Sequence, residues 1–440
     1  MTEAKPNILF FLPDQHRHDW LGTNTALPLR TPNLNRLCST GIQFTNAFTP
    51  SPLCAPARAC LASGMDYEHC RVPSNRENYP LDLPTYYQRL RDVGYRVCGV
   101  GKFDLHKDIA SPAADLDWYV DGSRSLEEWG FTEGIDNEGK IDGSSSYKAA
   151  GKPKGPYLAY LHEQGLAEAY VQEHAKRRKH RDAYVTSLPE EAYCDNWVSE
   201  NGLRFLRDFP KDQPWHLVVN FTGPHNPMDV TQRMHDNWKD VDFPPPVDTE
   251  QPGYSPDDHQ RNRRHYAAMI ENIDRQIGRF IDTVRERGEL DNTLIIYSSD
   301  HGEMLGDHSR WGKSIWRSPS TGIPLIAVGP SVCAGATSNA LVSLHDITAT
   351  LLDYAGAAPL QDADSRSLRP VLQSPDTQLR RFIFSGLNGW RMVFDGRYKL
   401  VVRENEPLLL YDIQNDPQER HDIAEKEPFI VQTLRGAVRR

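Results

Sequence analysis

The stretch SPLCAPARACLASG (51–64) places Cys54 between two prolines and four residues before Arg58. Proline has a fixed φ and no backbone N–H, so this segment suits neither a central strand nor a helix interior. We predict that Cys54 stands at a turn into a helix, with Arg58 one helical turn further along the same face. The residues alone leave two interpretations open for Cys54: a buried structural thiol, or a thiolate nucleophile activated by Arg58 and a helix N-terminus.

Groups that bind divalent metals follow two apolar segments of the chain. Asp14 and Gln15 come after NILFFLP (7–13), and Asp300 and His301 come after TLIIYSS (293–299). A set made mainly of oxygen ligands is typical of Ca²⁺, Mg²⁺ or Mn²⁺ sites, and the imidazole favours Mn²⁺ somewhat. One aspartate after a strand is usually only a turn residue, but two such pairs in one sheet favour a metal site. The scattered cysteines argue against structural zinc.

Four more side chains that carry or accept positive charge follow buried segments. Lys102 and His106 belong to GKFDLH, His225 ends NFTGPH, and Lys313 lies in RWGKS. Taken singly, each of these residues is typical of an ordinary protein surface. Together, and beside a divalent ion, these four residues predict a positively charged pocket. Such a pocket suits an ester of a tetrahedral oxyanion, whose negative charge moves onto the leaving oxygen in the transition state.

The elements that must position these residues alternate between buried strands and helices. Continuous apolar runs predict strands that are covered on both faces of a parallel sheet. These runs are NILFFLPD (7–14), YRVCGVG (95–101), WHLVVNF (215–221) and TLIIYSSD (293–300). Helices between them predict an α/β fold with a doubly wound mixed sheet. Ligands bind beyond the carboxyl ends of the strands in such sheets, and the chemical groups described above fall there.

Two regions of different composition suggest how the chain is divided. We predict a catalytic α/β domain over residues 1–375 and a small C-terminal α+β subdomain over 376–440. Residues 110–200 are polar and rich in Gly and Lys, which predicts a loop-rich insertion near the mouth of the site. Its basic run KRRKH (176–180) is interpreted as a solvated helical face. Asn-Gly and Asp-Gly turns after residue 375 predict antiparallel hairpins, followed by a closing helix.

The overall composition excludes several classes of protein. A net charge of −10 over 440 residues argues against a nucleic-acid partner. The chain has no apolar run of membrane-span length and no signal-peptide pattern, and its seven cysteines form no disulfide framework. We therefore expect no membrane partner and a cytoplasmic location, or a periplasmic or secreted one if a leader was removed.

The segment CAPAR (54–58) matches the Cys-x-Pro-x-Arg signature of the type I sulfatases, followed by that family's small-residue stretch to Gly64. The chain resembles this family over almost its whole length, including NILFFLPDQ, GPH, YSSDHGEMLGDH and LLLYDIQNDPQE. The resemblance implies an alkaline-phosphatase-like α/β fold and hydrolysis of sulfate esters. It also implies that a maturation enzyme oxidises Cys54 to formylglycine.

The resemblance further implies how the nucleophile and the metal are held. Formylglycine 54 would be hydrated to a gem-diol, of which one hydroxyl attacks sulfur and the other expels sulfate as the hemiacetal collapses. The second hydroxyl of the gem-diol allows sulfate to be expelled, whereas a thiol would form a stable adduct with the sulfur of the substrate. Asp14, Gln15, Asp300 and His301, together with the group derived from Cys54, would bind Ca²⁺, with Mn²⁺ or Mg²⁺ as alternatives.

The same resemblance assigns roles to the surrounding cations. Arg58 would hold the aldehyde hydrate, and His106 would support the gem-diol. Lys102 and Lys313 would clamp sulfate oxygens, while His225 would protonate the leaving alcohol.

Three departures from the common pattern bear on the substrate. Many sulfatases have Asp where this chain has Gln15, and Asn where it has His301, so the chain is nearer the choline-sulfatase and phosphonate-monoester-hydrolase side of the family. The Lys102-to-His106 spacing is longer than usual, and Asp104 occupies the customary histidine position.

We therefore predict a sulfatase acting on a sulfated carbohydrate or a small alkyl sulfate. The alternatives are a phosphonate or phosphate mono- or diester hydrolase on the same scaffold, and a non-catalytic binder of sulfated glycans. Trp311 and Trp316 are candidates for lining the subsite of the organic group, with packing as their alternative role.

Overall fold

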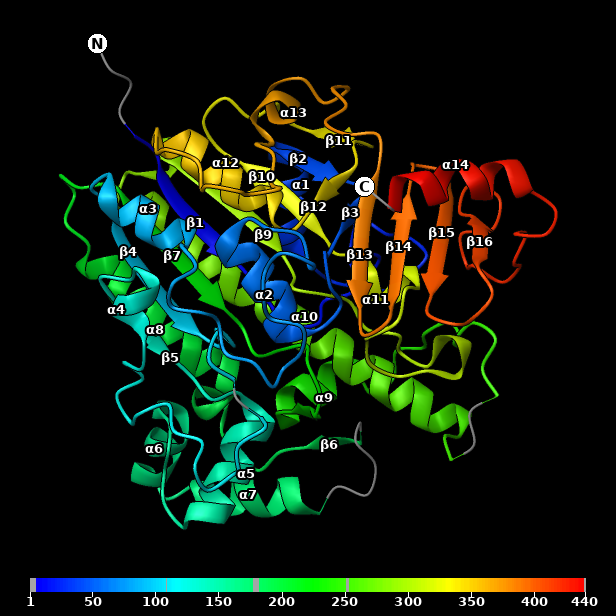
Figure 1. The fold of residues 1–440 in the computed structure, drawn as a ribbon. Coiled ribbons are helices and arrows are strands. Elements are labelled where there is room, and N and C mark those ends of the chain that lie inside the picture. The colour runs from blue at the N-terminus through cyan, green and yellow to red at the C-terminus, as the bar shows by residue number, and fades with distance from the viewer. Residues whose placement is uncertain (1–4, 108, 177–181, 251–252, 439–440) are drawn as a thin grey trace.

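A large mixed sheet forms the centre of the computed structural model, which describes residues 5–107, 109–176, 182–250 and 253–438 (Figure 1). Its eight strands lie in the order β11 (Ala336–Ser338), β2 (Ile42–Phe44), β10 (Leu325–Val328), β9 (Thr293–Ser298), β1 (Asn7–Phe11), β7 (Trp215–Asn220), β4 (Arg96–Gly101) and β5 (Glu133–Asp136). The five strands from β9 to β5 are mutually parallel, whereas β10 runs antiparallel to both of its neighbours. The predicted doubly wound mixed sheet is confirmed.

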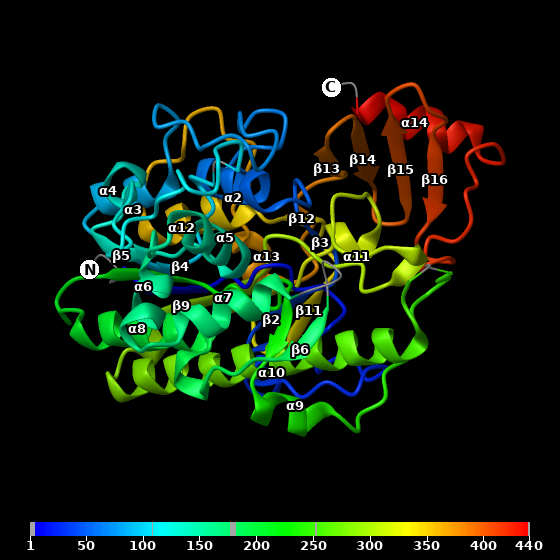
Figure 2. The ribbon, with the colours of Figure 1, turned by 90° about the horizontal axis from the view of Figure 1, so that it is seen from below.

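Both faces of the sheet are buried, which explains its continuous apolar strands. Along β1, Ile8 and Phe10 join one hydrophobic core while Leu9 and Phe11 join another, because successive side chains point to opposite faces. Helices cover the first core: α2 (Cys54–Ser63), α3 (Tyr86–Asp92) and α12 (Asp346–Ala355). The second lies under α1 (Pro32–Thr40), α8 (Cys194–Asp208) and α10 (Pro256–Glu286). Figure 2 shows α8 and α10 on one side of the sheet and α2, α3 and α12 on the other.

The segment 110–200, predicted to be a loop-rich insertion, combines short helices with turns and connecting loops. It contains α4 (Leu126–Trp129), α5 (Lys140–Ala150), α6 (Pro156–Glu163), α7 (Ala167–Ala175) and η1 (Glu190–Ala192), besides β5, β6 (Ala183–Val185) and the start of α8. Its glycines and prolines separate short helices: Gly151 ends α5 with φ 68°, and Pro156 opens α6. Most of the run KRRKH (176–180) lies outside the described residues.

The C-terminal region forms its own four-stranded antiparallel sheet beside the main one (Figure 1). Its elements are β13 (Ile383–Leu387), β14 (Trp390–Phe394), β15 (Tyr398–Arg403), β16 (Leu409–Asp412) and the covering helix α14 (Pro428–Val438). Asn388 and Gly389, with φ 41° and 84°, form the two-residue turn between β13 and β14. Both residues are left-handed, as a type I′ hairpin turn requires. The predicted hairpins and closing helix are confirmed, and the boundary at 375/376 stays a prediction.

The remaining elements are short or lie at the edges of these layers. They are β3 (Ala47–Phe48), β8 (Met228–Val230), α9 (Gln232–Trp238), η2 (Leu290–Asn292), η3 (Asp307–Ser309), α11 (Ser318–Thr321), β12 (Val342–Ser343) and α13 (Arg369–Gln373). Among the described residues, no helix is long and apolar enough to span a membrane.

Candidate active site

Four neighbouring parallel strands deliver the predicted chemical groups to one edge of the sheet. Asp300 follows β9, Asp14 follows β1, His225 follows β7 and Lys102 follows β4, and these strands are adjacent in that order. Because parallel strands end at the same edge, groups separated by up to 286 positions in the chain converge there.

Cys54 is the first residue of α2, as the prolines of its segment predict. Leu53 is extended, and Pro56 lies in the first turn, where the missing N–H has no intrahelical partner to lose. Asn75 supplies the cap that the local sequence lacks, since its Oδ1 accepts a hydrogen bond from the backbone N–H of Ala55 at 2.9 Å. At the other end, Gly64 is left-handed with φ 71°. The helix thus holds Cys54 at the edge of the sheet where the strand-end groups meet.

The Cys54 thiol is surrounded by cationic and imidazole groups. Its Sγ lies 3.2 Å from Lys313 Nζ, 3.3 Å from His301 Nε2 and 4.0 Å from Lys102 Nζ. Burial and Asp14 raise the pKa of the thiol, but Lys102 and Lys313, with a smaller contribution from His301, outweigh them, and the pKa is lowered overall. The position of Sγ is therefore one that stabilises negative charge.

Four side chains with metal-binding atoms form a compact buried cluster. The ligand atoms of Asp14, Cys54, Asp300 and His301 all lie within 4.8 Å of one another. Gln15 is adjacent: its backbone N–H donates to Asp300 Oδ1 at 2.9 Å, and its Oε1 accepts from Lys313 Nζ at 2.6 Å. Two carboxylates, an amide oxygen and an imidazole fit a divalent cation such as Ca²⁺ or Mn²⁺.

Arg58 is buried against the two carboxylates of this cluster. Its Nε donates to Asp300 Oδ2 at 3.0 Å, and its Nη2 lies 3.6 Å from Asp14 Oδ2. Its Nη1 donates to the carbonyl of Lys102 and to Asn220 Oδ1. Arg58 therefore fixes both carboxylates of the cluster and the chain that carries Lys102.

Lys102 contacts Asp14 Oδ2 directly and lies 3.0 Å from Asp104. Burial lowers the pKa of Lys102, but the charges of Asp104 and Asp14 raise it by a larger amount. The pKa of Lys102 therefore lies well above its ordinary value. For Asp14, burial raises the pKa, and the cations around it, Lys102 foremost, bring it well below its ordinary range. Both groups are therefore charged over the physiological pH range.

His225 is half-buried, and its Nδ1 lies 2.6 Å from the carbonyl of Asn226. A carbonyl only accepts, so Nδ1 carries a proton and the neutral ring presents Nε2 as an acceptor. Burial and the charge of Lys313 hold the pKa of His225 well below its usual range. In the free protein this imidazole is therefore neutral.

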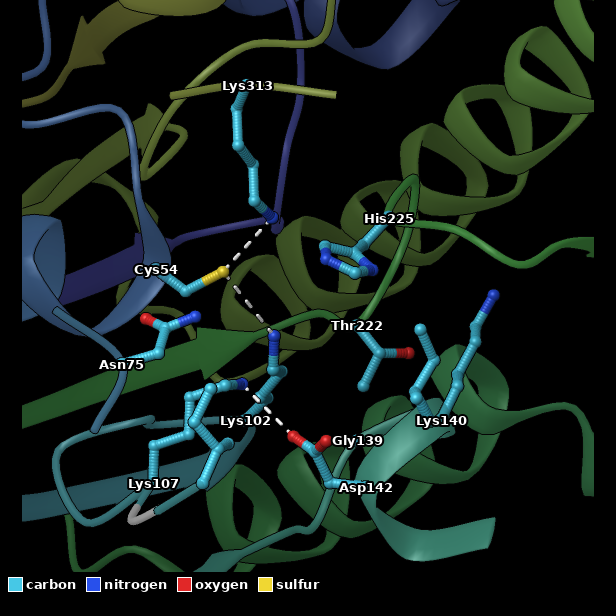
Figure 3. Close-up of a pocket in the computed structure, with 12 residues that line it drawn as sticks. Cys54, Asn75, Lys102, Lys107, Gly139, Lys140, Asp142, Thr222, His225 and Lys313 are labelled. Carbon is cyan, nitrogen blue, oxygen red and sulfur yellow. Dashed lines mark hydrogen bonds and ion pairs between the residues drawn. The ribbon is translucent and has the colours of Figure 1, made fainter. Parts of the chain in front are cut away.

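A cavity of about 240 Å³ opens over these groups (Figure 3). Figure 3 shows Lys313 and Lys102 reaching Cys54 from opposite sides, with His225 on the far wall. The cavity is lined by Cys54, Asn75, Lys102, Lys107, Ile109, Gly139, Lys140, Ile141, Asp142, Thr222, His225 and Lys313. Four of these, Gly139, Lys140, Ile141 and Asp142, belong to the segment 110–200, and Ile109 directly precedes it.

Lys107, rather than His106, reaches the cavity from the segment after β4. Asp104 is left-handed with φ 52°, which redirects the chain. Lys107 Nζ lies 2.8 Å from Asp104 and 3.1 Å from Asp142, while the carbonyl of His106 accepts a hydrogen bond from Arg124 at 2.7 Å. His106 is not among the described residues that line the cavity, and it takes no part in the mechanism proposed below.

The two candidate tryptophans pack against other rings instead of lining the cavity. Trp311 stacks on His259 with ring centroids 5.5 Å apart and an interplanar angle of 6°. Trp316 meets Trp390 edge-on at 6.0 Å. Their alternative role, packing, is what the structure supports.

The remaining cysteines have no disulfide partner in the described residues. Cys60, Cys70, Cys98 and Cys194 are buried, and Cys38 and Cys333 are half-buried, in keeping with structural thiols.

The structure defines an α/β protein with a candidate metal centre at the edge of its parallel strands, and comparison with known proteins identifies its family. The sulfatase family model matches residues 6–357, and a model for the C-terminal part of N-sulphoglucosamine sulphohydrolase matches residues 306–435. The chain belongs to the sulfatase family and is a sulfuric ester hydrolase.

A choline-sulfatase and a phosphonate monoester hydrolase both align with nearly the whole chain. A choline-sulfatase of Rhizobium meliloti is 28% identical, with 97% of this chain and 83% of the relative aligned. The phosphonate monoester hydrolase of Agrobacterium radiobacter has the same fold, with a TM-score of 0.81 at 22% identity over 98% of this chain and 94% of that one. A structure solved with its substrate D-glucosamine-2-N,6-O-disulfate gives a TM-score of 0.77 at 20% identity, covering 99% and 97%. The predicted alkaline-phosphatase-like fold is confirmed.

Proposed function

We propose that the protein hydrolyses a small sulfate monoester, on a sugar or an alkyl alcohol, with formylglycine 54 as the nucleophile. The observation that carries this proposal is the surroundings of Cys54: its Sγ lies at the wall of the cavity, 3.2 Å from Lys313 and 3.3 Å from His301. In the mature protein this atom is replaced by the oxygen of the aldehyde or of its hydrate.

The surrounding residues supply charge for each step. Lys102 and Lys313 face the position of a sulfo group bound against residue 54 and would neutralise its oxygens. A divalent ion held by Asp14, Gln15, Asp300 and His301 would act as a Lewis acid on the same group. Attack by one hydroxyl of the hydrate forms the new O–S bond while the ester S–O bond breaks.

His225 would protonate the departing alcohol oxygen. Its pKa is low in the free protein, where burial and Lys313 both disfavour the imidazolium. A bound sulfate ester brings negative charge between Lys313 and His225, which raises that pKa. His225 therefore takes up its proton together with the substrate. The second hydroxyl then loses its proton to water and its oxygen forms the C=O bond. The C–O bond to sulfate breaks at the same time, so sulfate leaves and the aldehyde re-forms.

The shape of the site favours a small substrate. The cavity, about 240 Å³, lies below the range of roughly 300–1,000 Å³ that is usual for drug-sized ligands. Sulfate fills part of this volume, which leaves room for one sugar ring or a short alkyl group. The saccharide named with one solved neighbour supports a sulfated sugar, and the choline-sulfatase relative supports a small alkyl sulfate.

The test is to compare protein made with and without the maturation enzyme. Mass spectrometry of the peptide that contains Cys54 should show the aldehyde only in the first preparation, and sulfate release should follow the aldehyde content. Cys54→Ala should abolish turnover while the fold is retained. Full activity of an unmodified thiol, or turnover by Cys54→Ala, contradicts the proposal.

A phosphonate or phosphate ester hydrolase is the second candidate, because Gln15 and His301 occupy the metal site where many sulfatases have Asp and Asn. Rates on an aryl sulfate and an aryl phosphonate monoester, measured on the same preparation, separate the two. Phosphonate turnover that is faster by orders of magnitude would favour this candidate.

The location, the domain boundary and the identity of the metal ion are further proposals. We propose a cytoplasmic location, which fractionation of the native host would test, and a catalytic domain that ends near residue 375. Ca²⁺ is the proposed ion, and metal analysis of protein purified without chelator would identify it.

A further inference from the structure

Glu303 is a buried carboxylate two residues beyond His301 for which the mechanism above has no use. Its two oxygens have different partners. Oε1 accepts hydrogen bonds from the backbone N–H of Leu305, at 3.1 Å, and from that of Gly312. Oε2 accepts from Nε2 of the Gln15 side chain. One carboxylate therefore connects the Gln15 amide to the loop that carries Lys313.

The orientation of the Gln15 amide matters because its two ends differ chemically. Its oxygen can bind a cation or accept from an ammonium, whereas its NH₂ group can do neither. In the structure the oxygen faces Lys313 Nζ, which itself lies 3.2 Å from Cys54 Sγ, and the NH₂ faces Glu303. Had the amide been reversed, its NH₂ would meet the ammonium of Lys313 and the predicted cation.

The backbone of Gln15 is held as firmly as its side chain. Gln15 is left-handed, with φ 73°, a conformation that is strained for a residue with a side chain. Its N–H donates to Asp300 Oδ1 at 2.9 Å, and its carbonyl accepts from the Tyr266 hydroxyl at 2.6 Å. With the backbone fixed, the amide can reverse only by rotation of its terminal group, and Glu303 opposes that rotation.

We propose that Glu303 is a positioning residue that keeps the oxygen of the Gln15 amide on Lys313, which itself contacts Cys54 of the cluster, so that an oxygen and not an NH₂ group is presented to the cation. An aspartate at position 15 would need no such partner, because both of its terminal atoms are oxygens. The role rests on the proposed metal site, since Gln15 is one of its predicted ligands.

Glu303→Gln tests this role without a change of shape. The backbone N–H groups of Leu305 and Gly312 require an oxygen at the Oε1 position, so the new NH₂ takes the Oε2 position. There it meets the NH₂ of Gln15, and two donors oppose each other. We expect Ca²⁺ and Mn²⁺ to bind about 10- to 100-fold more weakly, the usual effect of losing a group that orients a metal ligand.

The exchanged pair Gln15→Glu with Glu303→Gln restores the hydrogen bond in the opposite sense. The NH₂ at position 303 then donates to the carboxylate at position 15, whose other oxygen faces the cluster. In the Gln15→Glu background, Glu303→Gln should therefore leave cation affinity unchanged or raise it. A residue that only supports the fold would weaken binding equally in both backgrounds.

The experiment is a calorimetric titration of chelator-treated full-length protein with CaCl₂ and with MnCl₂, for the wild type, both single variants and the exchanged pair. Glu138→Gln, which removes another buried carboxylate that accepts backbone N–H groups, is the matched control and should bind the ions as the wild type does. Melting temperatures in chelator measure what each substitution costs the fold, separately from its effect on cation affinity.

The role of Glu303 would be overturned by an unchanged affinity in the Glu303→Gln single variant, or by equal losses in the two backgrounds. A wild type that binds neither ion would overturn it as well, by removing the metal site on which it rests. The proposed sulfatase mechanism has separate tests, in the mass of residue 54 and the loss of turnover in Cys54→Ala.

Discussion

Replacing Arg58 by methionine should destabilise the metal-free protein by about 3–5 kcal/mol. Arg58 is buried between the two carboxylates of the metal cluster, with its nitrogens 3.0 Å from Asp300 and 3.6 Å from Asp14. Methionine keeps much of the side-chain volume and removes only the charge and the hydrogen bonds. The variant therefore measures what the guanidinium contributes, with little cost from a cavity.

The magnitude follows from the two contacts. Unit charges at these separations attract by about 5 kcal/mol each at an effective dielectric constant of about 20. Burying the guanidinium offsets much of that attraction in the wild type. In the variant the carboxylates stay buried with one partner fewer, and breaking a buried pair in this way typically costs about 3–5 kcal/mol.

The assay is urea unfolding followed by circular dichroism, once in chelator and once in saturating Ca²⁺. A bound cation replaces part of the lost positive charge, so we expect a smaller loss in Ca²⁺ than in chelator. Arg285→Met is the control, because its exposed pair with Asp282 on α10 should contribute only about 0–1 kcal/mol. A loss below about 1 kcal/mol in chelator, or equal losses in both conditions, would refute the reasoning.

Three further predictions concern other parts of the fold. Burial raises the pKa of Asp274 to about 6, so the neutral carboxyl contributes fully to stability below about pH 4. This contribution, about 3 kcal/mol, is lost as the pH rises through about 6. The free energy of unfolding of the wild type, measured relative to that of Asp274→Asn, should therefore fall by this amount over that range. Gly101→Ala should destabilise the protein by more than about 2 kcal/mol in urea unfolding, since its φ is 107° and an added Cβ would lie 1.9 Å from the carbonyl oxygen of Asn220; a smaller loss would mean that β4 and β7 can separate. Lys399→Met should cost about 3–5 kcal/mol because it leaves the buried Glu419 without its 2.8 Å partner, and adding Glu419→Gln should recover much of the melting temperature; no recovery would contradict the pairing argument.

The strand ends of the site could be predicted because each depends on a short segment of chain. Apolar runs that end in Asp14 or Asp300 mark strands covered on both faces, and parallel strands place their ends together whatever the loops between them do. The turn at Asn388 and Gly389 is equally local, since both residues must be left-handed. The spacing of Cys54 and Arg58 on one helix face follows from helical geometry alone.

The segment 110–200 shows what its composition left open. Its polar, Gly- and Lys-rich composition predicts loops, and in the structure its Gly and Pro residues also end and begin short helices such as α5 and α6. A polar composition does not separate these cases, because short helices packed on one side need few apolar residues. The path of the chain after β4 was equally hard to predict: the left-handed Asp104 brings Lys107 to the cavity, whereas the family resemblance implied a role for His106.

The sequence by itself determined the class of fold, the edge of the sheet that carries the chemistry and the residue expected to become the nucleophile. Each depends on a periodicity or a motif within a few residues. The tertiary structure alone decided which side chains complete that site: Asn75 as the cap of α2, Arg58 between two carboxylates, and Glu303 against Gln15. These partners lie 20 to 288 positions apart. Hydrogen bonds between such partners depend on how whole helices and strands pack, and no local pattern in the chain encodes that packing.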